Sequence, residues 1–202
     1  EKLADIVGGL AADGCSIVDA GCGEGYYLQN LNRRLSRAGL MDTSIVGFDI
    51  SKWAVQRAAR RIPATWLVAS NRNIPLCDRS ADVLLSLFGF TAYGSFKRIL
   101  KNDGKLILAS AGPRHLIELR EVIYPSVNVS GSSELSQAQD SGFTLLDSMS
   151  VQYLIPALTQ PEIAQLLLMT PHLFRASREG RDKAQLLEHL PLSVDVEFHV
   201  LE

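Results

Sequence analysis

The chain of 202 residues has no long hydrophobic run, no excess of one charge and few aromatic residues, which make up 7%. Its longest uncharged apolar stretch, residues 83–96, is shorter than the roughly 20 residues that a membrane-spanning helix needs, so we expect no membrane contact. Lysine and arginine number 20 against 22 aspartate and glutamate, so the strongly basic character of a nucleic-acid-binding chain is absent overall. With 47% hydrophobic residues, the composition excludes global disorder and predicts a packed core.

Cysteine is scarce as well. The three cysteines, Cys15, Cys22 and Cys77, are an odd number without a C-x-x-C pair, which argues against a disulfide framework and against a structural zinc site in this chain. We therefore expect no bound metal and a reducing, cytoplasmic compartment. The N-terminus has no signal-peptide character. It lacks an initiator Met and starts inside an expected helix, which suggests a piece of a longer protein.

Short apolar runs alternate with amphipathic segments over the first half of the chain. The runs expected to form strands are Ser16–Ala20, Thr43–Asp49, Thr65–Ala69, Ala81–Leu87 and, after a turn at Asn102-Asp103-Gly104, Lys105–Ser110. The segments expected to form helices are Leu3–Leu10, Tyr26–Ala38, Lys52–Arg61 and Ala92–Leu100. This order predicts βαβ units and a mostly parallel sheet with helices on both faces.

The rhythm changes after Ser110. We expect a helix over His115–Tyr124 and a serine-rich loop over Pro125–Gln139. Two long strands, Phe143–Leu154 and Leu192–Leu201, are expected to pair antiparallel at the edge of a seven-stranded sheet, with helices Pro161–Met169 and Lys183–His189 between them. Because no linker is evident, we expect one α/β domain over residues 1–202.

The most informative segment is a glycine-rich loop after the first expected strand, Asp19-Ala20-Gly21-Cys22-Gly23-Glu24-Gly25. In open α/β sheets, ligands bind outside the carboxyl ends of the strands, where glycines let the backbone approach a ligand. The G-x-G-x-G spacing departs from the G-x-G-x-x-G of dinucleotide sites. Glu24 would repel a pyrophosphate but attract an ammonium group. The loop therefore favours a cofactor without a pyrophosphate.

Residues at the ends of the next two expected strands complete the candidate cofactor site. Asp49 ends the second strand, where an acid accepts hydrogen bonds from ribose hydroxyls, and Ile50 follows it in the same site. Ser70 and Asn71 follow the third strand and could meet an adenine edge. Asp19 has two alternative roles, either touching the cofactor through water or organising the loop.

These features resemble the class I S-adenosylmethionine-dependent methyltransferases. The motifs that carry this resemblance are Asp19 with the three loop glycines, Asp49, the Pro75 and Asp82 region and the Asn102-Asp103-Gly104-Lys105 turn. Further motifs resemble the RlmA-type family, which methylates N1 of a guanine in a hairpin of bacterial 23S ribosomal RNA. They are Gly21-Cys22-Gly23-Glu24-Gly25-Tyr26-Tyr27, Gly112-Pro113-Arg114-His115-Leu116, Leu168-Met169-Thr170-Pro171 and Arg175-Ala176, and together they span nearly the whole chain.

The resemblance implies a Rossmann-like fold, S-adenosylmethionine as cofactor and a 23S rRNA hairpin as partner, and a homodimer is left open. It places Gly23 and Glu24 at the methionine end of the cofactor, Asp49 on the ribose and His115 in the cofactor or acceptor pocket. Family members also carry an N-terminal zinc-binding module with Cys and His ligands and a segment that covers the cofactor. Neither is present in this sequence, so the chain is either trimmed or divergent.

Two residues are candidates for the chemistry. Methylation of guanine N1 removes a proton, so a general base or a stabiliser of the anionic ring is useful. His115 has the ordinary pKa of a base near neutrality, and Arg114 could steady the guanine oxygen as a charged donor. The alternative is that both residues merely begin a helix after the strand that Gly112-Pro113 ends.

Aromatic and basic residues are weaker candidates for contacts with the substrate. Phe88 and Phe90 could stack on a base, although we favour core packing for both. Tyr26 and Tyr27 flank the pocket or pack against the first helix. The basic residues that could meet RNA phosphates are Arg175, Arg178, Arg181 and Lys183.

Two other functions stay open at this stage. One is a class I methyltransferase that acts on a small molecule. The other is a catalytically inactive cofactor-binding protein kept for interaction.

Overall fold

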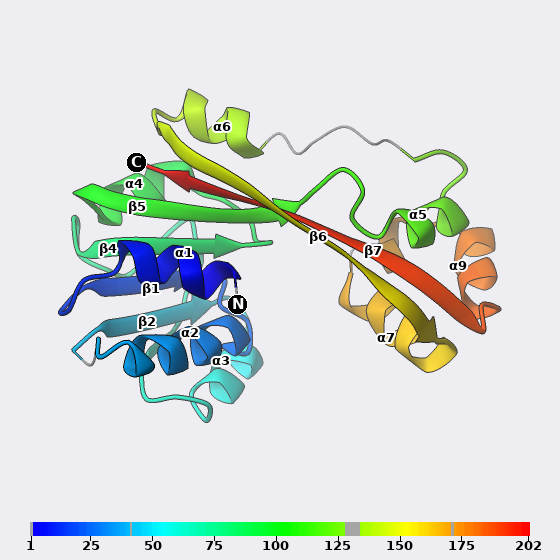
Figure 1. The fold of residues 1–202 in the computed structure, drawn as a ribbon, viewed down its shortest axis with the longest axis horizontal. Coiled ribbons are helices and arrows are strands. Elements are labelled where there is room, and N and C mark those ends of the chain that lie inside the picture. The colour runs from blue at the N-terminus through cyan, green and yellow to red at the C-terminus, as the bar shows by residue number, and fades with distance from the viewer. Residues whose placement is uncertain (1, 41, 128–133, 171) are drawn as a thin grey trace. The chain divides into compact units, whose positions relative to one another are not determined.

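A computed structural model describes residues 2–40, 42–127, 134–170 and 172–202 (Figure 1). The chain divides into two compact units. The first comprises Glu1–Ser110, Ser133–Met149 and Phe198–Glu202, and the second comprises Ala111–Ser132 and Ser150–Glu197. The expectation of a single domain stays a prediction.

Seven strands form the sheet, in the order β3-β2-β1-β4-β5-β7-β6. Their bounds are β1 Ser16–Ala20, β2 Ser44–Asp49, β3 Thr65–Val68, β4 Ala81–Leu87, β5 Leu100–Ala111, β6 Leu145–Thr159 and β7 His189–Leu201. Strands β1 to β5 pair in parallel. The backbones of Thr144 and Glu202 exchange N–H···O bonds of 2.8 and 2.9 Å, the pattern of an antiparallel pair. The expected α/β fold, a mostly parallel seven-stranded sheet with an antiparallel edge, is confirmed.

Helices follow the strands in alternation over the first half of the chain. Their bounds are α1 Lys2–Leu10, α2 Tyr26–Arg37, α3 Lys52–Ala58, α4 Tyr93–Ile99, α5 Ile117–Ile123, α6 Glu134–Asp140, α7 Gln160–Met169, α8 His172–Arg175 and α9 Arg178–Gln185. Helix α2 buries Leu28, Leu31 and Leu35, which share one face because they are three and four residues apart. Among the described helices, none is both long and apolar enough to cross a membrane.

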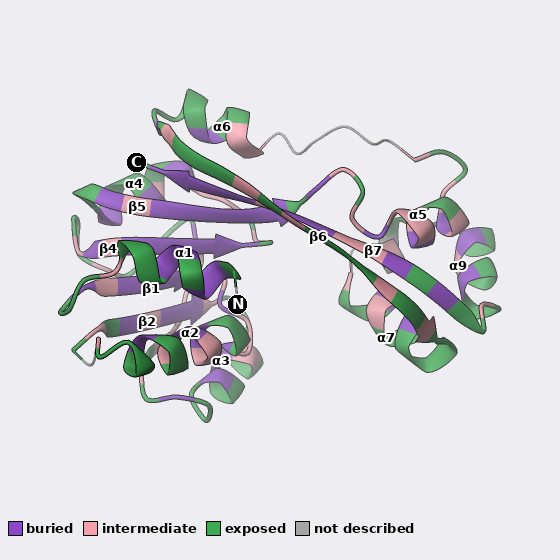
Figure 2. Ribbon diagram, in the orientation of Figure 1, coloured by how far each residue is buried: buried purple, intermediate pink, exposed green. Residues whose placement is uncertain are grey.

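The core of the first unit lies around the central strands. All residues of β4 except Asp82 are buried, as expected for a strand covered on both faces. Figure 2 shows this contrast with β6, along which no residue is fully buried. The side chains of Phe48 and Phe96 are fully buried in the same cluster. A central strand that is covered on both faces gives the loops at its carboxyl end a rigid base.

The second unit has a smaller core of its own, built from α5, α7, α9 and the first part of β7. Helices α5 and α9 approach closely at Gly180, where an added Cβ would overlap the carbonyl oxygen of Ile123. Leu119 and Leu192 are fully buried in this cluster. This core supports the loop that carries Gly112 to Leu116.

Three expectations about local structure are wrong. The Asn102-Asp103-Gly104 segment lies inside β5, because the register with β4 shifts between Ala81 and Val83 and absorbs the extra residues. The expected loop Pro125–Gln139 ends in helix α6, and its residues 128–133 lie outside the described residues. The last expected helix starts earlier, at α9, because the Ser177 hydroxyl accepts the N–H of Gly180 and caps it.

Candidate functional site

The glycine loop joins β1 to α2 at the carboxyl end of the sheet. Gly21, Gly23 and Gly25 have φ angles of 84°, 54° and 75°, in the left-handed region that favours glycine. The N–H groups of Gly21 and Cys22 both donate to the carbonyl of Phe48 at 2.9 Å, which fixes the loop to the end of β2. Apart from their chain neighbours, no described residue has an atom within 4 Å of a Cβ built at Gly21 or Gly23, so the backbone there is open to a ligand.

Asp49 connects the loop to the end of β2. Its Oδ2 accepts the N–H of Gly23 at 3.0 Å, and its Oδ1 accepts the N–H of Ser51 at 2.8 Å. Each carboxylate oxygen still has capacity for a further hydrogen bond. Asp49 therefore shapes the loop, and its expected contact with ribose hydroxyls stays a prediction.

Asp19 is the most unusual charged group in the first unit. Its side chain is 1% exposed, and neither carboxylate oxygen has a hydrogen-bond partner among the described residues. Burial, together with the nearby charge of Asp49, raises its pKa to about 7. The N–H of Gly23 donates to Asp49 and not to Asp19, and both expected roles of Asp19 stay predictions. A buried carboxylate without a partner, beside an open glycine loop, suits a ligand that carries positive charge, as S-adenosylmethionine does.

The other candidate cofactor residues have partners of their own. Glu24 forms ion pairs with Arg57 at 2.6 Å and Arg61 at 3.4 Å, which satisfy its carboxylate in this structure. Ile50 is 77% exposed directly after Asp49, so it is available to a ligand. Asn71 is buried and donates its amide N–H to the carbonyl of Phe90. The Ser70 hydroxyl accepts the N–H of Arg72 at 3.3 Å. The cofactor contacts of these residues stay predictions.

Aromatic side chains gather around the loop after β4, and the expected core packing of Phe88 and Phe90 is wrong. Their side chains are 48% and 60% exposed. Phe88 has a φ of 56°, which turns the chain outward at the end of β4. Its ring centroid lies 6.5 Å from that of Tyr27, which is 41% exposed. Tyr26 is 61% exposed, so neither tyrosine is buried against the protein.

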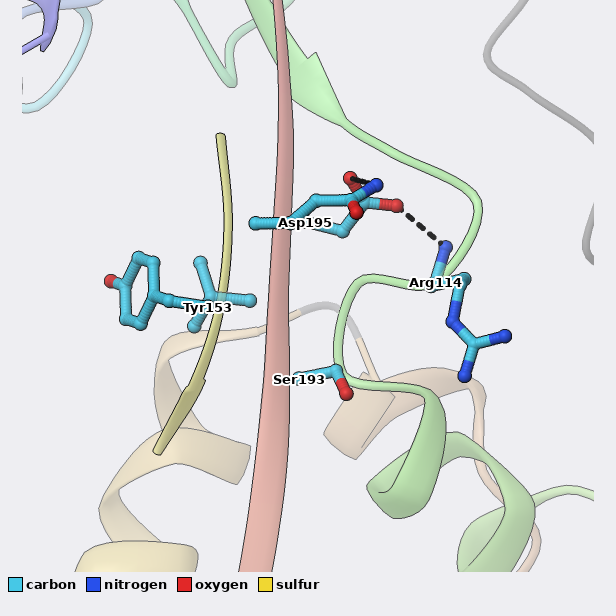
Figure 3. Close-up of a pocket in the computed structure, with 6 residues that line it drawn as sticks. Arg114, Tyr153, Ser193 and Asp195 are labelled. Atoms are coloured by element: carbon cyan, nitrogen blue, oxygen red, sulfur yellow. Dashed lines mark hydrogen bonds between the residues drawn. The ribbon is translucent and has the colours of Figure 1, made fainter. Parts of the chain in front are cut away.

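The motif Gly112-Pro113-Arg114-His115-Leu116 forms a loop in the second unit that is organised by Asp195 of β7. The Asp195 carboxylate accepts the N–H of Arg114 at 3.0 Å, and the Asp195 carbonyl accepts the N–H of Gly112 at 2.9 Å. The Asp195 N–H in turn donates to Nδ1 of His115 at 3.2 Å. Figure 3 shows the bond from Arg114 to Asp195. The motif therefore forms an ordered loop that is bonded to β7 and precedes helix α5.

A pocket of about 220 Å³ adjoins this loop (Figure 3). Its lining residues are Arg114, Gln152, Tyr153, Ser193, Val194 and Asp195. The Gln152 amide donates to Asp195 at 3.0 Å, so the carboxylate is satisfied on two sides. The Arg114 side chain is exposed, whereas Asp195 is 2% exposed. The two side chains therefore differ in function: Asp195 holds the loop, and the Arg114 guanidinium is available to a ligand.

Asp195 was missed by the sequence reasoning. Its signal is an acid inside the apolar run of the last strand, at a buried position where a hydrophobic residue is normal. A buried acid needs hydrogen-bond donors, and the N–H groups of a loop supply them. Nothing in the linear sequence indicates that this loop is the one around Gly112.

The other residues singled out from the sequence do not line one shared pocket among the described residues. Arg175 and Arg178 lie exposed in α8 and α9, and Lys183 pairs with Glu179 at 2.8 Å. Their contact with RNA phosphates stays a prediction, as do the roles of Leu168-Met169-Thr170-Pro171, of which Pro171 lies outside the described residues. Cys22 is buried beneath the loop, in agreement with a space-filling role. In the described part of the chain, no group of His, Cys, Asp and Glu could hold a metal ion.

Comparison with known proteins gives matches to methyltransferases in sequence and in fold. Residues 17–104 match the family model described as a methyltransferase domain. The chain also matches the solved structure of an S-adenosylmethionine-dependent methyltransferase from Aquifex aeolicus, with a TM-score of 0.60 at 13% identity over 98% of this chain and 87% of that one. The fold is therefore that of Rossmann-like methyltransferases, and residues 17–104, which include the glycine loop, match a methyltransferase domain.

Two curated relatives are similar in sequence. The chain is 32% identical over 185 residues to the Bacillus subtilis protein YxjB, which is provisionally named a 23S rRNA (guanine-N(1)-)-methyltransferase; the match covers 91% of this chain. It is 31% identical over 118 residues, 57% of its length, to the 23S rRNA (guanine(748)-N(1))-methyltransferase of Streptomyces fradiae. The chain spans 65% of the Bacillus relative's length and 40% of the Streptomyces relative's. The chain is therefore similar in sequence to two proteins that are named 23S rRNA guanine-N1-methyltransferases.

Proposed function

We propose that this protein transfers a methyl group from S-adenosylmethionine to N1 of a guanine in a hairpin of 23S rRNA. The observation that carries the proposal is the extent of the similarity to the Bacillus relative, which covers 91% of the chain. The methyltransferase family model ends at residue 104, inside the first unit. Similarity that continues through the second unit supports a shared substrate, because the cofactor loop of the first unit is common to the whole class.

The residues of the first unit have the properties needed to bind the cofactor. S-adenosylmethionine supplies a methyl group that is activated by a sulfonium centre. The open backbone of Gly21 and Gly23 admits the ligand, and Asp49 offers its carboxylate to the ribose hydroxyls. Asp19 contributes a buried negative charge that a cationic ligand would stabilise. In-line transfer then depends on proximity and orientation of the two substrates.

The partner in this proposal is RNA, and its location is the cytoplasm, where ribosomal RNA is modified. The exposed Arg175 and Arg178 of the second unit are candidates for phosphate contacts. The chain has nearly balanced charge, so these exposed arginines are a local basic feature and not part of a basic chain. A homodimer stays an open prediction.

Methylation assays test the proposal directly. The chain is incubated with labelled S-adenosylmethionine and transcripts of 23S rRNA hairpins, and the digested RNA is analysed for N1-methylguanosine by mass spectrometry. Asp49→Ala is the matched control, which should fail to bind the cofactor in calorimetry. Label in N1-methylguanosine supports the proposal. Transfer to small molecules with none to RNA contradicts it, as does cofactor binding without transfer to any acceptor.

A further inference from the structure

Two aromatic rings from neighbouring strand ends lie close together in the first unit. Phe88 follows β4, and Tyr27 lies in the first turn of α2, directly after the glycine loop. Because β1 and β4 pair in parallel, their carboxyl ends lie at the same edge of the sheet, where ligands bind in folds of this kind. A Cβ built at Gly89 would lie 3.8 Å from the carbonyl oxygen of Ala20, so the segment after β4 packs against the start of the glycine loop. Both rings therefore lie beside the loop that is expected to hold the cofactor.

The geometry of the Tyr27–Phe88 pair differs from that of a packed aromatic pair. The ring centroids are 6.5 Å apart and the ring planes are inclined by 33°, which is neither stacked nor edge-to-face. Tyr93 and Phe96, which are buried in the core, lie edge to face with an angle of 80°. A flat base between two rings lies roughly 3.5 Å from each of them, so a sandwich needs about 7 Å between the ring centres. The spacing of Tyr27 and Phe88 is close to this value, and both side chains are exposed, so a small rotation would align them around a base.

The backbone of Phe88 is strained at the point where its ring is exposed. Its φ of 56° lies in the left-handed region, which is unfavourable for a residue with a bulky side chain. The chain is fixed on either side of this angle, because the Phe88 N–H donates to the carbonyl of Ala109 at 2.8 Å and the Phe90 carbonyl accepts the side-chain amide of Asn71. Strained residues of this kind cluster at active sites and ligand clamps, where the surrounding structure holds them in place. The strain is therefore an indication of function that is independent of the ring spacing.

We infer that Tyr27 and Phe88 form an acceptor-base clamp, in which the guanine that receives the methyl group lies between the two rings. The choice of guanine rests on the proposed function. Enzymes that modify a base take it out of the stack, and both faces of such a base are free to stack on aromatic side chains. The Tyr26 ring meets that of Tyr27 edge to face, with centroids 5.5 Å apart, and restrains it. The clamp orients the base beside the glycine loop and selects flat acceptors.

NMR of the two rings tests the clamp without any turnover. The chain is labelled with ¹³C-phenylalanine and ¹³C-tyrosine and saturated with S-adenosylhomocysteine, and the two ring signals are assigned as those lost in Phe88→Leu and Tyr27→Leu. Guanosine 5′-monophosphate is titrated to millimolar concentrations, with ribose 5-phosphate as the control that lacks a base. We expect the nucleotide to shift both ring signals upfield, because each ring then faces the base, and ribose 5-phosphate to shift neither. Unshifted signals, or equal shifts with both ligands, overturn the clamp. If guanosine 5′-monophosphate shifts both signals but the chain methylates no RNA, the proposed function fails and the clamp stands.

Variants of the two rings distinguish a ligand contact from a packing contact. Phe88→Gly removes the ring and relieves the backbone strain, so its Tm should equal or exceed that of the wild type. Its affinity for the 23S rRNA hairpin transcript that the wild type binds should nevertheless fall by about 5- to 150-fold in fluorescence anisotropy. Tyr27→Leu should lose affinity by a similar factor, Tyr27→Phe should keep it, and Trp53→Leu, which removes an exposed ring from α3, should keep it as well. A lower Tm with unchanged affinity in Phe88→Gly would assign the ring to packing and overturn the clamp.

Discussion

The carboxylate of Asp195 occupies the space where a side chain at Gly112 would stand. A Cβ atom built at Gly112 would lie 2.5 Å from Asp195 Cγ and Oδ2, closer than two such atoms approach in proteins. Asp195 is buried, and its carboxylate accepts hydrogen bonds from Arg114 and Gln152 on either side. The glycine of the motif is therefore required by a strand residue that lies far away in the sequence.

Gly112→Ala should lower stability, because the new methyl group must displace a buried carboxylate. Overpacking of this kind costs about 1–3 kcal/mol, which lowers Tm by roughly 2–12 °C in a chain of this size. Gly94→Ala is the control, since no atom lies within 4 Å of a Cβ at Gly94 and alanine favours the helix. Thermal unfolding followed by circular dichroism measures both. A Gly112→Ala protein as stable as Gly94→Ala would show that the loop adapts freely.

Much of the first unit could be predicted from the sequence, because its signals are local. The strands β1 and β4 and the loop from Gly21 to Gly25 follow from short apolar runs and glycine spacing. The role of Asp195 could not be predicted, since it depends on a contact between a strand and a loop that are distant in the sequence. The exposure of Phe88 depends on its positive φ angle, and a positive φ angle at phenylalanine cannot be predicted from the sequence.

The stability of the protein without cofactor should fall as pH rises, because of Asp19. Its pKa is raised to about 7, mainly by burial, whereas an unfolded aspartate titrates near 4. The folded state therefore binds more protons between these values, and the stabilisation present below pH 4 is lost as pH rises through 7. This group alone should remove about 2–3 kcal/mol between pH 5 and pH 8.

Urea unfolding of the wild type and Asp19→Asn at pH 5 and pH 8 measures this effect. The variant has no proton to lose at this position, so its stability should depend less on pH. Asp140→Asn, at the exposed C-terminal end of α6, is the matched control and should keep the wild-type dependence. An identical pH dependence in Asp19→Asn and the wild type would show that the buried carboxylate does not titrate in this range.

The Glu24 carboxylate can pair with arginine or with the cofactor ammonium group, and two variants distinguish these roles. Its carboxylate accepts from Arg57 at 2.6 Å, and this hydrogen bond lowers the pKa of Glu24. If Glu24 also holds the cofactor ammonium group, Glu24→Gln should weaken S-adenosylmethionine binding by about tenfold in calorimetry. Arg57→Gln removes the shorter of the two ion pairs and should leave affinity unchanged or increase it, because Glu24 then keeps only the 3.4 Å contact with Arg61. Exposed ion pairs contribute little, so Tm should hardly change in either variant. Unchanged affinity in Glu24→Gln would limit Glu24 to the ion pairs.

Phe88 should affect the RNA substrate and not the cofactor. Its exposed ring lies beside that of Tyr27, at the end of β4 next to the strand that carries the glycine loop. Stacking of one base on an aromatic ring contributes about 1–3 kcal/mol, so Phe88→Ala should raise KM for an RNA hairpin by about 5- to 150-fold. Phe88→Tyr should keep the wild-type KM, and Trp53→Ala, which removes a more exposed ring from α3, should have no effect. Calorimetry should give the same S-adenosylmethionine affinity for all four proteins. An unchanged KM in Phe88→Ala, or a loss as large in Trp53→Ala, would contradict base stacking at this loop.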